Sequence, residues 1–141
     1  MAGGYAPNTF AVLLVEDVPV QMMAAASALR DAGLRVVEAP TVEAATSALA
    51  ADPELRAMIA DIDLGGEPLM GLTLAKAVAA RWPDVVLLLI SGAIVPETEA
   101  MPAGARFLRK PFEPEALAEA VRGLVSAREA GRLAPDGSVM G

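Results

Sequence analysis

Short apolar runs alternate with stretches of helical periodicity along most of the chain. The apolar runs that predict β-strands are residues 10–15, 34–37, 57–60, 85–90 and 106–108. Helical spacing of apolar residues predicts helices over about 19–33, 41–51 and 69–81, and from residue 113 onward. Strands that alternate with helices need crossover connections, which are right-handed and place helices on both faces of a parallel sheet. The pattern therefore predicts an α/β fold, a (βα)5 doubly wound sandwich around a five-stranded parallel sheet.

Local signals indicate where several of these helices begin and end. Pro19 suits a first helical turn, Thr41 is a good N-cap, and Gly33 lies where a helix end favours a left-handed residue. Between the fourth and fifth predicted strands, Pro96 and Pro102 leave room for barely a turn or two of helix. We therefore expect the fourth helix to be shortened.

Length and composition place these elements in one domain. The chain has 141 residues, of which 55% are hydrophobic, enough for one well-buried core. We expect an N-terminal extension at 1–9, a single domain at 10–128 and a flexible tail at 129–141. The longest strongly apolar run, 85–90, is too short to span a membrane, and residues 1–9 lack the features of a signal peptide. A cytoplasmic protein is therefore expected.

The charge and the missing residue types exclude several classes of function. The formal net charge is -7, which argues against binding nucleic acid or anionic membranes through basic residues. Cysteine and histidine are both absent, which excludes disulfides, thiolate and imidazole metal sites, and serine or cysteine triads. Phosphohistidine cannot form on this chain either. Any metal site must therefore be built from oxygen ligands.

Polar and charged residues follow four of the five predicted strands. They are Glu16 and Asp17 after the first strand, Asp61 after the third, Ser91 after the fourth and Lys110 after the fifth. Ligands of doubly wound sheets bind beyond the carboxyl ends of the strands, so we expect these groups to share one rim. Oxygen ligands suit a hard cation such as Mg²⁺. A metal ion, an ammonium and a hydroxyl around a carboxylate nucleophile are typical of phosphoryl transfer.

Each of these motifs has an ordinary structural interpretation when taken alone. An acidic pair such as 16–17 is often part of a solvated loop, and Asp61 with Asp63 could form an Asx-turn or cap a helix. The joint occurrence at four strand ends favours a functional site. Lys110 stands out further because the chain has only one other lysine, Lys76, in the middle of a predicted surface helix.

Four segments together resemble the response-regulator receiver family of two-component signalling. They are Val-Leu-Leu-Val-Glu-Asp at 12–17, Ala-Asp-Ile-Asp-Leu-Gly-Gly at 60–66, Leu-Ile-Ser-Gly-Ala at 89–93 and Phe-Leu-Arg-Lys-Pro-Phe at 107–112. The resemblance covers about residues 10–127. It implies a flavodoxin-like fold and a phosphoacceptor switch, not an enzyme.

The resemblance also implies a role for each acidic residue at the predicted rim. Asp61 would accept the phosphoryl group and share in binding Mg²⁺. Asp17 would bind Mg²⁺ directly, and Glu16 would support the ion through water. Asp63 would offer its main-chain carbonyl to the metal.

Three further residues would respond to the phosphoryl group. The resemblance implies that Ser91 moves to hydrogen-bond it and that Lys110 pairs with its oxygens. Phe107 occupies the aromatic switch position, which in the family swings inward when the hydroxyl moves. The Lys110-Pro111 peptide would be cis, a form nearly confined to bonds before proline.

The sequence departs from the family pattern in several places. Ser91 replaces the commoner threonine, and Phe107 excludes a switch that relies on a tyrosine hydroxyl. The loop 65–71 is slightly longer than usual and lacks the usual Met-Pro. A shortened fourth helix would alter the face that the family uses for dimers and effectors, so we expect a monomer or weak dimer.

The favoured hypothesis is a receiver that is phosphorylated by a histidine kinase or phosphotransfer domain. Only a short stretch follows the last predicted helix, so we expect output through contact with a downstream protein partner. A degenerate receiver that docks without phosphorylation is one alternative. A phosphatase of the haloacid-dehalogenase type is another, since Asp61 and Asp63 resemble its nucleophile motif, although that motif normally lies on the first strand.

Overall fold

Five parallel strands form the centre of the molecule. The computed structural model describes residues 10–92, 96–97 and 100–131. The strands are β1 (Ala11–Val15), β2 (Arg35–Ala39), β3 (Leu55–Asp61), β4 (Val86–Ser91) and β5 (Arg106–Arg109), in the spatial order β2-β1-β3-β4-β5. All four strand pairs are parallel. The predicted parallel sheet is therefore confirmed, with β3 at its centre.

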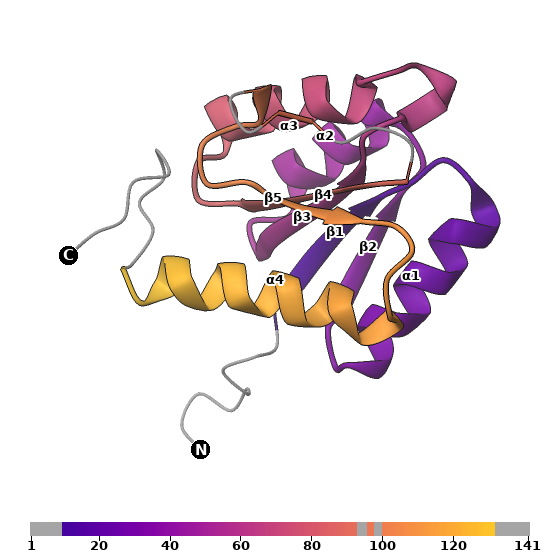
Figure 1. Cartoon of the computed structure of the whole chain (residues 1–141). Coiled ribbons are helices and arrows are strands. Elements are labelled where there is room, and N and C mark those ends of the chain that lie inside the picture. The colour runs from indigo at the N-terminus through magenta and orange to yellow at the C-terminus, as the bar shows by residue number, and fades with distance from the viewer. Residues whose placement is uncertain (1–9, 93–95, 98–99, 132–141) are drawn as a thin grey trace.

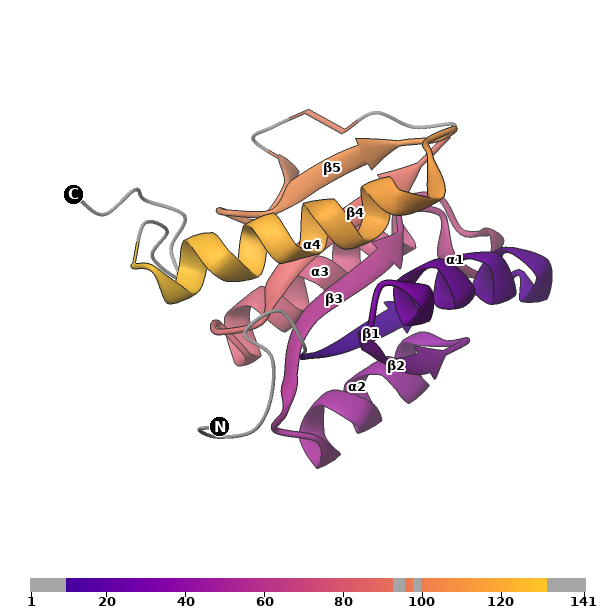
Figure 2. The ribbon, with the colours of Figure 1, turned by 90° about the horizontal axis from the view of Figure 1, so that it is seen from below.

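Helices cover both faces of this sheet. They are α1 (Pro19–Asp31), α2 (Val42–Ala51), α3 (Met70–Arg81) and α4 (Pro114–Glu129), with a short 3-10 turn η1 (Leu64–Gly66) before α3. Helices α2 and α3 pack on one face, and α1 and α4 pack on the other (Figures 1 and 2). The doubly wound α/β fold expected from the alternating pattern is thus confirmed, and it has the strand order of flavodoxin-like proteins. The expected shortened fourth helix, between Pro96 and Pro102, falls partly on residues 98–99, which lie outside the described residues.

The central strands bury side chains on both faces, so the sheet divides the core into two layers. On β1, Leu13 and Val15 belong to the layer under α2 and α3, which we call the α2/α3 core. Val12 and Leu14 belong to the layer under α1 and α4, the α1/α4 core. Every residue of β4 is buried, as expected for a strand that helices cover on both sides. The continuous apolar runs of the sequence reflect this arrangement.

The expected helix boundaries agree with the backbone geometry. Pro19 is the first residue of α1, and Gly33 follows its C-cap with a φ of 92°. Thr41 caps α2, and its hydroxyl accepts a hydrogen bond from the Ala44 amide at 3.1 Å. Helix α4, predicted from residue 113 onward, begins at Pro114 and buries one apolar face that includes Leu117, Val121 and Leu124. The helix boundaries predicted from proline, threonine and glycine are therefore confirmed.

Two strands differ in extent from the prediction. Strand β3 begins at Leu55 instead of residue 57, and it includes Arg56, whose side chain pairs with Glu129 of α4. Strand β2 runs to Ala39 and includes the exposed Glu38. A charged residue interrupts an apolar run in the sequence, but a strand tolerates it where the side chain reaches solvent.

The two ends of the expected domain lie near the limits of the described residues. The expected N-terminal extension, 1–9, lies outside them, as do residues 132–141 of the expected tail. Helix α4 ends at Glu129. No helix in the described part of the chain is long and apolar enough to cross a membrane.

Candidate functional site

The strand order brings the expected site residues to one rim of the sheet. Strands β1, β3, β4 and β5 are consecutive neighbours, and their carboxyl ends carry Glu16, Asp61, Ser91 and Lys110. Asp61 is the last residue of β3 and pairs with Ile90, the residue before Ser91. Residues separated by up to 94 positions in sequence thus meet because the strands run parallel.

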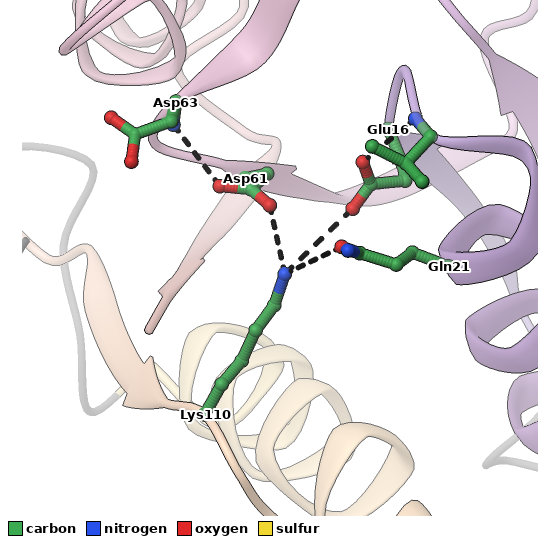
Figure 3. A network of polar contacts seen from close by, with 6 residues as sticks. Glu16, Gln21, Asp61, Asp63 and Lys110 are labelled. Atoms are coloured by element: carbon green, nitrogen blue, oxygen red, sulfur yellow. Dashed lines mark hydrogen bonds and ion pairs between the residues drawn. The ribbon is translucent and has the colours of Figure 1, made fainter. Parts of the chain in front are cut away.

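Lys110 is the centre of the polar network at this rim. Its ammonium donates hydrogen bonds to Asp61 Oδ2 and to Gln21 Oε1, each at 2.8 Å (Figure 3). The nearest oxygen of Glu16 lies 3.9 Å from Lys110 Nζ, an ion pair without a hydrogen bond. One cation therefore faces two carboxylates and one neutral amide.

Both carboxylate oxygens of Asp61 have partners within the protein. Oδ1 accepts a hydrogen bond from the Asp63 amide at 3.0 Å, which closes an Asx-type turn, and Oδ2 faces Lys110. The Asp61 side chain is 13% exposed, so its carboxylate remains open to solvent on one side. The turn that we considered as an ordinary alternative is thus present, and it orients the carboxylate toward the lysine.

The backbone behind Asp61 touches the start of α3. The amide of Gly71, the second residue of α3, donates a 2.7 Å hydrogen bond to the carbonyl of Ile62. A Cβ atom on Gly71 would lie 1.8 Å from the carbonyl oxygen of Asp61 and 2.8 Å from Cα of Ile62. Only glycine allows this close approach, so the start of α3 packs directly against the backbone of Asp61.

Glu16 is the buried acid of the site. It is 3% exposed, and its Oε2 accepts a hydrogen bond from the Val18 amide at 3.0 Å. Burial raises the pKa of Glu16 above its ordinary value, since a charged carboxylate loses its water. The Val18 hydrogen bond and the charge of Lys110 partly oppose this shift of the pKa, and the nearby Asp61 adds to it.

Replacing Glu16 by glutamine is expected to stabilise the folded protein at neutral pH. A folded-state pKa above 4.5 means that the folded state holds the Glu16 proton more tightly than the unfolded state. The stability that Glu16 contributes is therefore complete below pH 4.5 and is lost as the pH rises through the folded-state pKa. Urea unfolding of the wild type and Glu16→Gln at several pH values should show a gain that is absent at low pH and reaches a plateau near pH 7.

The exposed Glu119 of α4 provides the matched control for this comparison. Glu119→Gln removes the same charge from a solvated position, so its difference from the wild type should show no such step. A Glu16→Gln gain that is the same at every pH would contradict burial of the charge as its cause.

The fifth strand places Lys110 through its main chain. The Lys110 amide donates to the carbonyl of Ser91 at 3.0 Å, and the Lys110-Pro111 peptide is cis, as expected. Ser91 itself is 1% exposed, at the last position of β4. Lys76 is exposed in the middle of α3. The two lysines therefore have different environments, as the sequence predicts.

Three other expected site residues are less closely tied to the network. Asp17 is exposed in the loop between β1 and α1. The carboxylate of Asp63 points away from Lys110 (Figure 3), and its Oδ1 is buried without a hydrogen-bond partner among the described residues. Phe107 is partly buried against the α2/α3 core.

The site offers oxygen donors for a metal ion but no complete protein cage. Within the described ranges, no three histidine, cysteine, aspartate or glutamate side chains are grouped as metal ligands. Glu16 and Asp61 face a common space beside Lys110. Mg²⁺ commonly takes one or two carboxylates and fills its other positions with water and phosphate oxygens. The donor set therefore fits Mg²⁺ better than a metal that needs nitrogen or sulfur ligands.

Gln21 is the member of the network that the sequence did not identify. It lies in the first turn of α1, four positions after Asp17. When a helix begins shortly after a strand, the first turn of the helix lies close to the carboxyl end of that strand. The only sequence feature that could have identified Gln21 is its polar side chain in this first turn. Exposed glutamines are common in helices, so this feature does not indicate a site by itself.

Comparison with known families identifies a match over most of the chain. The model described as response regulator receiver domain matches residues 12–122. No curated protein matches the sequence.

Several solved structures share the fold. A response regulator receiver domain protein from Clostridium thermocellum is 16% identical, with a TM-score of 0.73, over 86% of this chain and 98% of the other. A response regulator from Thermotoga maritima is 24% identical, with a TM-score of 0.68, over 84% and 98%. NtrX from Brucella abortus, in complex with ATP, is 27% identical, with a TM-score of 0.76, over 87% of this chain but 28% of NtrX.

Proposed function

The chain belongs to the response regulator receiver family, and on that premise we propose that it takes a phosphoryl group on Asp61 and acts as a switch in two-component signalling. The contact that carries this proposal is the 2.8 Å hydrogen bond between Lys110 Nζ and Asp61 Oδ2. A lysine ammonium beside a partly open carboxylate can neutralise the charge that a phosphoryl group brings. The proposed nucleophile and its cation are thus already side by side.

The proposed reaction transfers the phosphoryl group from a phosphohistidine of a histidine kinase or phosphotransfer domain. A carboxylate oxygen of Asp61 forms a bond to phosphorus while the bond between phosphorus and the donor imidazole nitrogen breaks. The electron pair of that bond returns to the imidazole, which then takes up a proton. Lys110, which already contacts Asp61, would pair with the oxygens of the phosphoryl group during this exchange.

Mg²⁺ is the proposed cofactor. Asp61 and Asp17 would hold the ion, Glu16 would support it through water, and Asp63 would contribute its main-chain carbonyl. When bound, the ion would supply additional positive charge for the phosphoryl oxygens. Buried Glu16 suits a supporting role, since its carboxylate is fixed by the Val18 amide.

The proposed switch links the new phosphoryl group to the surface through two residues. Ser91 would hydrogen-bond the group from the end of β4, and Phe107 would change its packing against the α2/α3 core. Phosphorylation adds about 1.5 to 2 negative charges at neutral pH, enough to shift a balance between two arrangements. A downstream protein partner would read the altered surface.

Intact mass measurement tests the proposal directly. The protein is incubated with acetyl phosphate, with and without Mg²⁺, and the expected result is one added phosphoryl group that appears only with Mg²⁺. Folded protein that gains no mass under any donor, including a phosphorylated histidine kinase, would overturn the proposal and favour a docking module. Rapid multiple turnover of a small phosphate ester would instead favour a phosphatase.

Removing Asp17 is expected to weaken Mg²⁺ binding by at least about tenfold, since a carboxylate ligand of a hard cation is lost. Its carboxylate is exposed, so the fold should not change. Mg²⁺ titration of Asp17→Ala, followed by the dependence of phosphorylation on metal concentration, measures the effect. Asp84→Ala, a change at another exposed aspartate, is the matched control. Equal Mg²⁺ affinity in all three proteins would contradict the role of Asp17.

A further inference from the structure

The amide of Gln21 is the second hydrogen-bond acceptor of the Lys110 ammonium. Gln21 Oε1 lies 2.8 Å from Lys110 Nζ, the same distance as Asp61 Oδ2 (Figure 3). The two partners come from different elements, one from α1 and the other from the end of β3. Lys110 is therefore held between a helix and a strand.

The chemistry of the two acceptors differs. An ammonium has three donors, and Asp61 and Gln21 use two of them. Glu16, at 3.9 Å, attracts the charge but accepts no hydrogen bond. The amide of Gln21 is neutral, so it restrains the ammonium without cancelling its charge. A third carboxylate at this position would have lowered the positive charge available to a phosphoryl group.

The backbone around Gln21 is well placed to act as an anchor. Gln21 lies in the first turn of α1, and the next residue, Met22, is buried in the α1/α4 core. The side chain of Lys110 is 29% exposed and has a flexible four-carbon stem. A fixed acceptor on α1 therefore limits a side chain that would otherwise move freely at the rim.

We propose that Gln21 is a positioning residue that holds the Lys110 ammonium toward Asp61 and so speeds phosphorylation of that carboxylate. This inference rests on the proposed function for its effect on rate. The restraint on Lys110 can be measured without any phosphoryl donor. Gln21 itself touches no reacting group in the described structure, and it acts through the lysine.

The mobility of the two lysines is the first readout. Lysine-labelled protein should give NMR signals from only Lys76 and Lys110, so the exposed Lys76 serves as an internal reference. In the wild type, we expect the order parameter of the Lys110 side chain to exceed that of Lys76. Gln21→Met, which keeps the length but removes the acceptor, should lower the Lys110 value toward that of Lys76. A Lys110 side chain that is equally restrained in both proteins would overturn the inference.

The rate of phosphorylation by acetyl phosphate at saturating Mg²⁺ is the second readout. A small donor is used because a kinase could contact α1 and confuse the result. We expect Gln21→Met to react roughly 3- to 10-fold more slowly than the wild type, since a displaced charged group stabilises the transition state less well. Ser27→Met, at an exposed position farther along α1, should react at the wild-type rate. A wild-type rate in Gln21→Met would contradict the role in positioning.

Gln21→Glu separates restraint from charge. Glutamate keeps an oxygen acceptor at the same length, so Lys110 should remain restrained in the NMR measurement. Its added negative charge should still slow phosphorylation, because it offsets the charge of Lys110. Phosphorylation of Gln21→Glu at the wild-type rate would show that the neutral amide has no advantage and would overturn that part of the inference.

The two readouts also distinguish this inference from the proposed function. If the wild type accepts no phosphoryl group, the proposed function fails, and the NMR comparison alone still decides whether Gln21 restrains Lys110. If the wild type is phosphorylated normally and Gln21→Met neither frees Lys110 nor slows the reaction, only the role of Gln21 fails.

Discussion

Asp61→Asn is expected to abolish phosphorylation while leaving the fold intact. The asparagine amide keeps the shape of the side chain, and its oxygen can still accept the hydrogen bond from the Asp63 amide. It is, however, a poor nucleophile, and its NH₂ group would face the Lys110 ammonium in place of Oδ2. Loss of a covalent nucleophile lowers rates by far more than loss of a supporting group, so we expect a fall of more than about 1,000-fold.

Intact mass after incubation with acetyl phosphate and Mg²⁺ measures this effect. Circular dichroism and a thermal unfolding curve confirm that the variant is folded. Asp84→Asn, which makes the same chemical change at an exposed site, should gain the phosphoryl group like the wild type. Labelling of Asp61→Asn at the wild-type level would mean that another residue is the acceptor.

Gly71→Ala is expected to produce the second large effect, on stability and on phosphorylation together. The added methyl group would lie 1.8 Å from the carbonyl oxygen of Asp61, and this oxygen belongs to the backbone and cannot rotate away. Either α3 or the end of β3 must shift. Overpacking of this kind costs about 1–3 kcal/mol. A shift at Asp61 would also misplace its carboxylate relative to Lys110, so phosphorylation should slow even where the variant is folded.

Gly123→Ala is the matched control for this prediction. Gly123 also lies within a helix, and a Cβ atom there would meet only the end of the Arg106 side chain, at 3.8 Å. Alanine is the better helix former by about 1 kcal/mol, so this variant should be slightly more stable than the wild type. Urea unfolding gives both values, and acetyl phosphate labelling at low temperature gives the rates. Equal stability of Gly71→Ala and Gly123→Ala would contradict a tight contact behind Asp61.

Most of the fold could be predicted because its signals are local. Thr41 caps its helix through a hydroxyl three residues away from the amide that it binds, and Gly33 ends α1 in a left-handed conformation. Strands β1 and β4 could be predicted from their continuous apolar runs, because both faces of these strands are buried and need apolar side chains. Strand β2 was harder to delimit because it lies at the edge of the sheet, where Glu38 can reach solvent.

The site was only partly predictable from the sequence. Some of its residues follow strands and can be located by that rule, whereas others meet only through tertiary packing. Asp61 and Lys110 could be associated because each follows a predicted strand, and parallel strands end at one rim. The contact between Gly71 and the Asp61 carbonyl depends on how close α3 approaches β3, which no local pattern encodes. The same is true of Gln21, whose role depends on the direction of a flexible side chain from β5.

The division of the core into two layers has a consequence for synthesis on the ribosome. The buried members of the α2/α3 core all come from residues 11–89, whereas the α1/α4 core includes side chains of α4 from Leu117 to Val125. The face under α2 and α3 can therefore be covered before α4, which completes the other face, has been synthesised. A nascent chain that pauses before Leu117 would lack α4, so the apolar side chains of β3 and β4 on that face would stay exposed. This exposed surface is the form that a chaperone near the exit tunnel would bind.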